Sequence, residues 1–298
     1  ISIFQMYLIL KKIKYDLLFA VCGGYGDFRT ETAGLIASRI LKFKNNFLMI
    51  HHNYTKPILW RSIILFFDKI AGKGIKKLIF SSHATKKSII YNSKIAGYNK
   101  SKIKIIRNGV TLNKIKYKKI QILNSKRNKI KIGMLSRIEK YKGHEDMVDG
   151  IYMLPLNIKK KFLVFFIGKG EKKFVNYLKK KIIQRGLKNQ IIFLDYINID
   201  SRIILKNLDL LISLTRDFEN FGYSLAESML VGTPVLATNV GGIKEYLNNK
   251  NSCLIKPNDT KKLSKSLVNF YYNRRLWKKK TALGSNLIKK KFNSNYMS

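Results

Sequence analysis

The sequence predicts an α/β protein built from two Rossmann-like, doubly wound domains. Short apolar runs alternate with helix-length amphipathic stretches, a pattern typical of βα units and parallel sheets. The chain has 298 residues, enough for two domains of ordinary size with a core each. A polar, lysine-rich stretch at 111–128 shows no clear periodicity and is interpreted as the linker. We place one domain at 1–118 and the other at 119–298.

The first domain is predicted to contain four short strands, too few for a complete doubly wound sheet. Strands are expected at 16–21, 47–50, 78–81 and 104–106, and helices at 30–42, 59–70 and 83–95. The first strand is expected to be buried and to lead into a glycine turn at 23–26. Because the chain begins with Ile1 and the strands are few, we expect this domain to be incomplete at its start. An incomplete sheet would expose an edge and apolar surface.

The second domain is more regular and predicts a complete doubly wound sheet. Six strands are expected at 130–135, 163–167, 191–194, 208–213, 234–237 and 253–255. The main helices are expected at 145–153, 172–185, 222–231 and 260–272. In such a sheet the ligand crevice lies at the carboxyl ends of the strands.

The composition indicates a globular protein with a large excess of positive charge. Lysine and arginine total 59 residues against 17 aspartates and glutamates, which gives a formal net charge of +42. Such an excess favours polyanionic partners such as nucleic acid, an anionic membrane or phosphorylated substrates. Lysines scattered among isoleucines and asparagines are equally typical of an AT-rich genome. The charge alone therefore identifies no partner.

Cysteine usage and hydropathy favour a cytoplasmic protein. Cys22 and Cys253 are too far apart for a disulfide framework or a metal site, which fits a reducing compartment. No apolar stretch reaches the roughly 18 to 20 residues of a membrane-spanning helix. Segment 58–67 fits either an amphipathic helix at a membrane interface or an ordinary core helix. Peripheral binding to an anionic surface at the inner face of the cytoplasmic membrane therefore stays open.

One motif of the second domain places two carboxylates around a strand-to-helix turn. Glu219 follows a predicted strand, a helix begins near Gly222, and Glu227 lies inside that helix. The free N–H groups and the dipole at a helix start favour a bound anion such as a diphosphate. The two carboxylates can accept hydrogen bonds from hydroxyls on two parts of one ligand, such as a sugar and a ribose. A solvated helix with surface glutamates is the alternative.

A second motif places two cations after the first strand of the same domain. Arg137 and Lys142 belong to one predicted βα loop, which ends at Gly143 and His144. Two cations there can neutralise a diphosphate and stabilise the charge that builds on it as a glycosidic bond breaks. Ordinary solvated charges are the alternative, so this motif carries weight only beside the carboxylate motif. His83 and His144 are expected to be structural or solvent-facing.

Together the two motifs resemble those of glycosyltransferase family 4. The family patterns are G-R-L-x-x-x-K-G and E-G-F-G-x-x-x-x-E-A-M-x-x-G-x-P-V-x-x-T-x-x-G-G, and they correspond here to residues 136–143 and 219–242. The resemblance covers the second domain and continues more weakly through 82–85 and 106–110. Five departures remove no group that the chemistry needs: Ser136 and Asn220 stand for Gly, Ser228 for Ala, Arg107 for Pro and Thr111 for Asp.

The resemblance implies a GT-B fold, in which two Rossmann-like domains face a cleft, and a retaining glycosyltransferase with a nucleotide sugar as donor. Arg137 and Lys142 would bind the diphosphate. Glu227 would bind the ribose and Glu219 the transferred sugar. A donor phosphate oxygen would help to take the acceptor's proton, and no metal or other cofactor is implied. Further donor contacts would come from Tyr196 near the base and from Phe221, Gly222, Tyr223 and Ser224 around the sugar and phosphate.

The first domain is implied to bind the acceptor. A histidine near the transferred sugar is common in the family, and His52 matches its distance from the strand better than His51 does. A hydrogen-bonded structural histidine is the alternative. Gly23, Gly24 and Arg29 belong to a turn and helix start that either line the acceptor pocket or form a plain βα turn.

Several other functions compete with this prediction. The charge suggests a nucleic-acid-binding protein, but dispersed lysines provide neither clustered arginines nor aromatic platforms, so no nucleic-acid partner is expected. A nucleotide-sugar epimerase or a phosphorylase is not expected to carry both motifs. An inactive, truncated glycosyltransferase stays open. For an active enzyme we expect a saccharide or lipid-linked acceptor, in the synthesis of lipopolysaccharide or another cell-surface polysaccharide.

Overall fold

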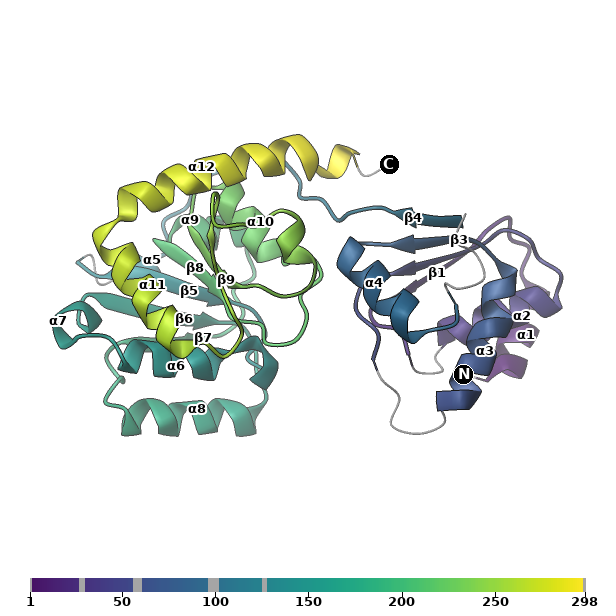
Figure 1. Ribbon diagram of the computed structural model, residues 1–298, viewed down its shortest axis with the longest axis horizontal. Coiled ribbons are helices and arrows are strands. Elements are labelled where there is room, and N and C mark those ends of the chain that lie inside the picture. The colour runs from purple at the N-terminus through teal and green to yellow at the C-terminus, as the bar shows by residue number, and fades with distance from the viewer. Residues whose placement is uncertain (1, 27–29, 56–60, 96–101, 125–127, 297–298) are drawn as a thin grey trace. The chain divides into compact units, whose positions relative to one another are not determined.

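The protein folds as two compact units, each built on its own parallel sheet. The computed structural model describes residues 2–26, 30–55, 61–95, 102–124 and 128–296. Contacts divide the chain after Asn108, so that Ile1–Asn108 form the first unit and Gly109–Tyr296 the second (Figure 1). The first sheet has four strands and the second has six. The sequence placed the boundary later, after residue 118.

The segment before residue 121 belongs to the second unit because its carbonyl groups are bonded there. Arg202 donates from Nη1 to the carbonyls of Thr111 and Asn113, both at 3.0 Å. Asn207 donates from Nδ2 to the carbonyl of Lys118 at 2.9 Å. These bonds follow no hydrophobic period, so the sequence showed only a polar stretch and the boundary was predicted too late.

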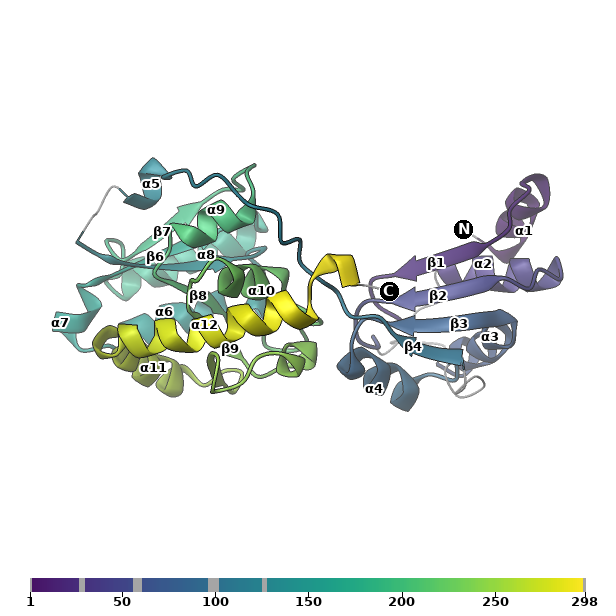
Figure 2. The same cartoon turned by 90° about the horizontal axis from the view of Figure 1, so that it is seen from above.

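The first unit is a sheet covered by helices on one face. Its strands lie in the order β1-β2-β3-β4 and are all parallel. Each crossover leads to the next strand in the same direction, and right-handed crossovers then put the helices on the same side, as both views show (Figures 1 and 2). The elements are α1 (Ile3–Lys12), β1 (Leu18–Cys22), α2 (Thr30–Ile40), β2 (Asn46–Ile50), α3 (Arg61–Gly74), β3 (Ile75–Phe80), α4 (His83–Asn92) and β4 (Ile103–Ile105).

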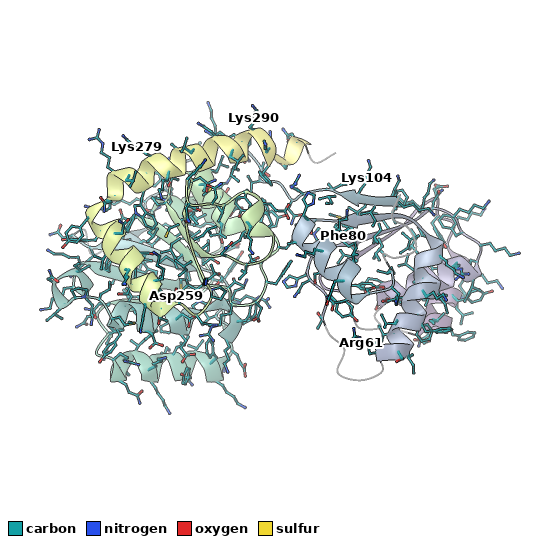
Figure 3. The ribbon with its side chains drawn as sticks, in the orientation of Figure 1. Arg61, Phe80, Lys104, Asp259, Lys279 and Lys290 are labelled. Carbon is teal, nitrogen blue, oxygen red and sulfur yellow. The ribbon has the colours of Figure 1, made fainter. Side chains whose placement is uncertain are left out.

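The opposite face of this sheet is uncovered by any helix of the described residues. Phe19 and Val21 of β1 are each 46% exposed, and the Phe19 ring meets that of Phe47 edge-on at 6.5 Å. Lys104 of β4 extends away from the helices (Figure 3). The prediction of a buried first strand was therefore wrong. Only the side of β1 that faces the helices is covered, so its residues alternate in burial.

Helix α3 contains most of the segment that fits either a core helix or a membrane-interface helix. Its Asp68 is buried and accepts hydrogen bonds from Tyr25 Oη at 2.8 Å and from Ser93 Oγ at 2.7 Å. Burial raises the pKa of the Asp68 carboxyl. On its outer side Ile63 is 44% and Phe66 58% exposed. Along the described parts of the chain, no helix is long and apolar enough to cross a membrane.

The second unit contains the six predicted strands, in the order β10-β9-β8-β5-β6-β7. The order runs outward in both directions from the neighbours β5 and β8, so this sheet is doubly wound. Its strands are β5 (Ile130–Leu135), β6 (Phe162–Ile167), β7 (Ile191–Leu194), β8 (Leu210–Ser213), β9 (Val235–Thr238) and β10 (Cys253–Ile255). Its α-helices are α5 (Gln121–Asn124), α6 (His144–Tyr152), α7 (Leu156–Lys159), α8 (Lys172–Gln184), α9 (Ser201–Lys206), α10 (Tyr223–Leu230), α11 (Thr260–Tyr272) and α12 (Arg274–Lys291).

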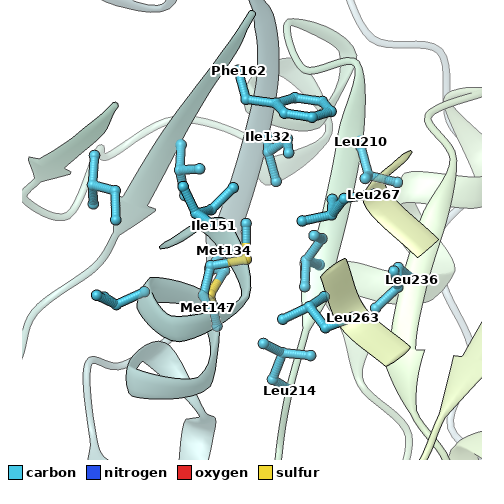
Figure 4. Close-up of a cluster of buried hydrophobic side chains, with 14 of the residues drawn as sticks. Ile132, Met134, Met147, Ile151, Phe162, Leu210, Leu214, Leu236, Leu263 and Leu267 are labelled. Atoms are coloured by element: carbon cyan, nitrogen blue, oxygen red, sulfur yellow. The ribbon is translucent and has the colours of Figure 1, made fainter. Parts of the chain in front are cut away.

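Two apolar cores hold this sheet between its helices. All six residues of β6 are buried, as expected for an inner strand covered on both faces. Phe162, Val164 and Phe166 face the core shared with α6, α8 and α11, part of which Figure 4 shows. Leu163 and Phe165 face the core shared with α9 and α10. Each such buried side chain contributes about 1.5–3 kcal/mol to folding.

Helices α1 and α12 were not predicted. Small residues form much of the packed face of α12, and a Cβ on its Gly284 would lie 2.6 Å from Met229 Sδ of α10. At this contact α12 and α10 approach closely without large apolar side chains on α12. The hydrophobic period that would mark α12 as a helix is therefore weak in the sequence. Outside, α12 carries many lysines, of which Lys279 and Lys290 are labelled in Figure 3.

Replacing Arg202 with alanine should loosen the segment that enters the second unit. Arg202 is 8% exposed and is paired with Asp200 as well as with the two carbonyls. Leaving these partly buried acceptors without a donor should lower the free energy of unfolding by about 1–3 kcal/mol. Urea denaturation of the full chain measures this change. The exposed Lys188→Ala should cost less than about 0.5 kcal/mol, and an equal loss in both variants would contradict the assigned role.

Candidate active site

The predicted donor-binding residues gather at one edge of the second sheet. Arg137 and Lys142 follow β5, Tyr196 follows β7, and segment 219–227 follows β8. Strands β5 and β8 pair directly, and the strand order reverses between them. The carboxyl ends of strands at such a reversal leave a crevice between the flanking loops. The topology thus places both motifs beside each other, whereas Tyr196, 64% exposed, follows β7, two strands along the sheet from β5.

An ion pair joins the two motifs. Lys142 Nζ lies 2.7 Å from Glu219 Oε2, and the two side chains are only 15% and 20% exposed. Thr215 Oγ1 donates to the same carboxylate oxygen at 3.3 Å. This pair is partly shielded from water, so its attraction is stronger than that of a surface pair. The carboxylate and the ammonium group are therefore held together at the strand reversal.

Two glycines fix the backbone around this pair. Gly143 has φ 73°, and a Cβ there would lie 2.3 Å from the carbonyl oxygen of Leu214. Gly241 has φ 58°, and its Cβ would lie 2.2 Å from the carbonyl oxygen of Glu219. The next residue, Gly242, donates its N–H to that oxygen at 2.8 Å. Both loops can approach so closely only because these positions lack a side chain.

Arg137 lies outside the ion pair but is connected to it. Its Nη1 is 2.9 Å from Glu139 Oε1, and its Nη2 donates to Tyr141 Oη at 2.9 Å. The ammonium group of Lys142 lies over the Tyr141 ring, 5.0 Å from its centre. Burial raises the pKa of the Tyr141 hydroxyl. Tyr141 thus lies between the two cations, and the exposed Arg137 guanidinium has room to turn toward a ligand.

The start of α10 offers backbone donors next to Glu219. Gly222 is the N-cap, with φ 68°, and no side chain caps the helix. Phe221 is buried, and its carbonyl accepts a hydrogen bond from Tyr246 Oη at 2.5 Å. Tyr223 is 50% exposed and Ser224 is partly exposed. The free backbone N–H groups of an uncapped helix start are suited to binding an anion, and the Tyr246 bond holds the segment that leads into this helix.

Glu227 occupies a separate position within α10. Ser201 Oγ donates to its Oε2 at 2.6 Å. Burial raises the pKa of the Glu227 carboxyl, and Asp200 adds to this while Arg202 opposes it. The structure therefore gives each glutamate its own partner, and no hydrogen bond between Glu219 and Glu227 occurs in this part of the structure.

Of the two alternatives expected for His144, structural or solvent-facing, the structure shows the first. Its side chain is fully buried, and its ring meets that of Phe166 edge-on at 4.9 Å. Burial lowers its pKa to about 4, so the ring is neutral at physiological pH. His83 is exposed, which is the other alternative.

The remaining predicted residues lie in the first unit. Gly23 and Gly24 follow β1, and a Cβ on Gly24 would lie 3.4 Å from Thr55 Oγ1, so both positions tolerate a small side chain. His52 lies just beyond β2, with its Nδ1 2.5 Å from Asn53 Oδ1. Arg29 lies outside the described residues. The acceptor-side and catalytic roles of these residues stay predictions.

Sequence reasoning missed three residues that hold the site: Ser201, Thr215 and Tyr246. Ser201 and Tyr246 bond motif residues from other parts of the chain, whereas Thr215 bonds Glu219 from within the same loop and accepts a hydrogen bond from Lys142 of the other motif. Only Ser201 carries a weak signal, because it follows Asp200, the N-cap of α9. As far as the described residues go, no three His, Cys, Asp or Glu side chains gather as a metal site would require.

Comparison with known proteins agrees with this geometry. Residues 116–290 match the family described as Glycosyl transferases group 1. An uncharacterized glycosyltransferase of Methanocaldococcus jannaschii is 26% identical over 307 residues, which cover 98% of this chain and 75% of that protein. HepE of Anabaena, crystallised with UDP, has a TM-score of 0.83 at 21% identity, covering 99% of this chain and 79% of its own. A glycosyltransferase of Rickettsia africae has a TM-score of 0.79 at 22% identity, with 99% and 77% covered.

Two Rossmann-like units, one of them with charged loops at its strand reversal, define a glycosyltransferase of the GT-B fold. The chain belongs to the glycosyl transferases group 1 family. The fold and enzyme class predicted from residues 136–143 and 219–242 are therefore confirmed.

Replacing Gly241 with alanine should disturb Glu219 specifically. Its positive φ and the clash with the Glu219 carbonyl should together lower the free energy of unfolding by about 2–4 kcal/mol. Gly186 is a matched control, because it has φ 64° but a Cβ added there would meet nothing within 4 Å. Gly186→Ala should cost only about 1 kcal/mol. Urea denaturation of both variants measures the two losses of stability. Equal losses would mean that the close approach of Gly241 to the Glu219 carbonyl is unimportant.

Proposed function

We propose that this enzyme is a retaining glycosyltransferase whose second unit binds a nucleoside diphosphate sugar. The observation that carries the proposal is the Lys142–Glu219 ion pair, 2.7 Å long and partly shielded, at the strand reversal. Lys142 supplies a positive charge for a diphosphate, and the Glu219 carboxylate beside it can accept hydrogen bonds from sugar hydroxyls. HepE, which has the same fold, has been crystallised with UDP and with UDP-glucose.

In this proposal the donor diphosphate competes with Glu219 for Lys142. Its negative charge attracts the ammonium group, and Arg137 turns from Glu139 to add a second cation. Glu219 is then free to accept hydrogen bonds from hydroxyls of the transferred sugar. The diphosphate charge is met by these side chains and by the backbone from Phe221 to Ser224, so the proposal includes no metal.

The ribose and base occupy the neighbouring part of the edge. Glu227 accepts hydrogen bonds from the ribose hydroxyls in its ionised form, and Ser201 holds its other oxygen in place. Tyr196, exposed after β7, packs against the base. The cost of burying the Glu227 charge, which its raised pKa reflects, is offset when two hydroxyls bond to it.

The reaction in this proposal keeps the anomeric configuration. The bond between the anomeric carbon and the donor phosphate breaks as the acceptor oxygen bonds to the same face of that carbon. The acceptor's proton passes to the departing phosphate oxygen, and the products are a glycoside and a nucleoside diphosphate. Arg137 and Lys142 stabilise the charge that builds on the phosphate. His52 of the first unit completes the proposal as a contact of the transferred sugar.

Calorimetry with UDP-, GDP- and ADP-sugars would test the donor site. One donor should bind the wild type, and Glu227→Ala should weaken it by at least tenfold, since a hydrogen bond to a charged acceptor contributes about 1.5–3 kcal/mol. Because the complex favours the carboxylate, wild-type affinity should fall as the pH is lowered through the raised pKa of Glu227. In Glu227→Gln this part of the pH dependence should vanish. No binding by a folded wild-type chain would exclude the proposed site.

For the acceptor we propose a saccharide or a lipid-linked saccharide of a cell-surface polysaccharide or lipopolysaccharide, reached from an anionic membrane surface. The support is the net charge of +42 and the apolar outer side of α3. Basic and apolar groups together favour adsorption to anionic lipid.

Sedimentation with phosphatidylglycerol vesicles at low salt would test the membrane part. The double variant Ile63→Ser with Phe66→Ser should bind severalfold more weakly than the wild type, because it removes exposed apolar area. Ile90→Ser with Tyr91→Ser, on the exposed side of α4, is the matched control and should bind like the wild type. If the wild type does not sediment at all, the membrane part of the proposal fails.

A further inference from the structure

We propose that the second unit carries a second anion site, at the amino ends of its strands, which binds the phosphate group of a phosphate ester. Two hollows adjoin there, with volumes of about 430 and 390 Å³, and they share Asp209 and Arg274. The first is also lined by Pro234, Phe270, Arg275 and Lys278. The second is also lined by Asn128, Lys129, Ile130, Lys131, Lys161 and Tyr271.

The lining of these hollows is far more basic than the chain as a whole. Six of their twelve residues are lysine or arginine, against 59 of 298 in the sequence. The cations come from three places that are distant in sequence: the start of β5, the residue before β6 and the start of α12. A general lysine excess would scatter charge over the surface. Here the fold gathers positive charge from three segments in two adjoining hollows.

Four of these cations have no partner in the described structure. Lys161, Arg274, Arg275 and Lys278 form no ion pair and no side-chain hydrogen bond with any described residue. Arg274 and Arg275 open α12, whose first turn holds no acidic residue, so they also face the positive end of the helix dipole. These positive charges repel one another, and a bound anion would attract each of them and offset that repulsion.

The other lining residues narrow the chemistry of the ligand. Asp209 is the one acid among the described lining residues, and its Oδ2 already accepts the backbone N–H of Lys131 at 2.8 Å, which gives it a structural role. Phe270 and Pro234 provide an apolar wall beside Arg274. A phosphate ester fits this combination better than a bare ion, because its organic part can pack against that wall. A soluble phosphorylated molecule and a phospholipid headgroup share this chemistry.

This site is distinct from the proposed donor site. The hollows lie where the strands begin, and the Lys142–Glu219 pair lies beyond the ends of the same strands. The six residues of β5 alone span about 20 Å. Both sites can therefore be occupied at once, and the second does not depend on the first.

Calorimetry with pyrophosphate, together with sedimentation of phosphatidylglycerol and phosphatidylcholine vesicles, would test the proposal on the full chain. The test variant is Lys161→Gln with Arg274→Gln, and Arg275→Gln with Lys278→Gln is a second one in case the first does not fold. The matched control is Lys173→Gln with Lys180→Gln on α8, which removes two exposed charges that line neither hollow. Lys142→Ala identifies any pyrophosphate bound at the donor site.

The test variants should bind pyrophosphate or phosphatidylglycerol vesicles at least tenfold more weakly than the control. Loss of pyrophosphate binding that persists in the Lys142→Ala background assigns the phosphate group of a soluble ligand to these hollows. Loss of vesicle binding alone assigns a phospholipid headgroup. If the test variants bind both ligands as well as the control does, or if test and control variants lose affinity for both ligands equally, the hollows hold no anion site and the proposal is overturned.

Discussion

The reversal of strand order between β5 and β8 is the constraint on which the candidate site depends. Successive crossovers leave in opposite directions there, so no helix covers the gap between the loops that follow these strands. Lys142 follows one of the strands and Glu219 the other, which is why residues 77 positions apart can form a short ion pair. The apolar cores on both faces hold the strands, and the glycines let the loops close over them.

Regular elements with a strong hydrophobic period could be predicted from the sequence. The strand 130–135, the strand 191–194 and the helix 260–272 were predicted to the residue. The failures have physical reasons. Helix α12 packs through Gly284 and other small residues, the segment before 121 is held by hydrogen bonds to its carbonyls, and β1 is covered on one side only.

The charged residues of the site could also be predicted, but not their support. Glu219, Glu227, Arg137 and Lys142 stand in patterns whose spacing is visible along the chain. Ser201, in contrast, reaches Glu227 across 26 residues, and a serine at the start of a short helix is too common to signal that contact. The spacing of the motifs marks these charged groups along the chain, whereas the groups that orient them are known only when the fold is.

The packing of α12 separates what the fold requires from what the surface displays. Its inner face depends on close approach at Gly284 and on a few apolar anchors such as Trp277 and Ile288, while lysines such as Lys279 and Lys290 make no contribution to that contact (Figure 3). Drift in the base composition of the genome can therefore change the surface charge without reaching the core. The solubility of the protein and its sensitivity to ionic strength can evolve while the catalytic architecture stays the same.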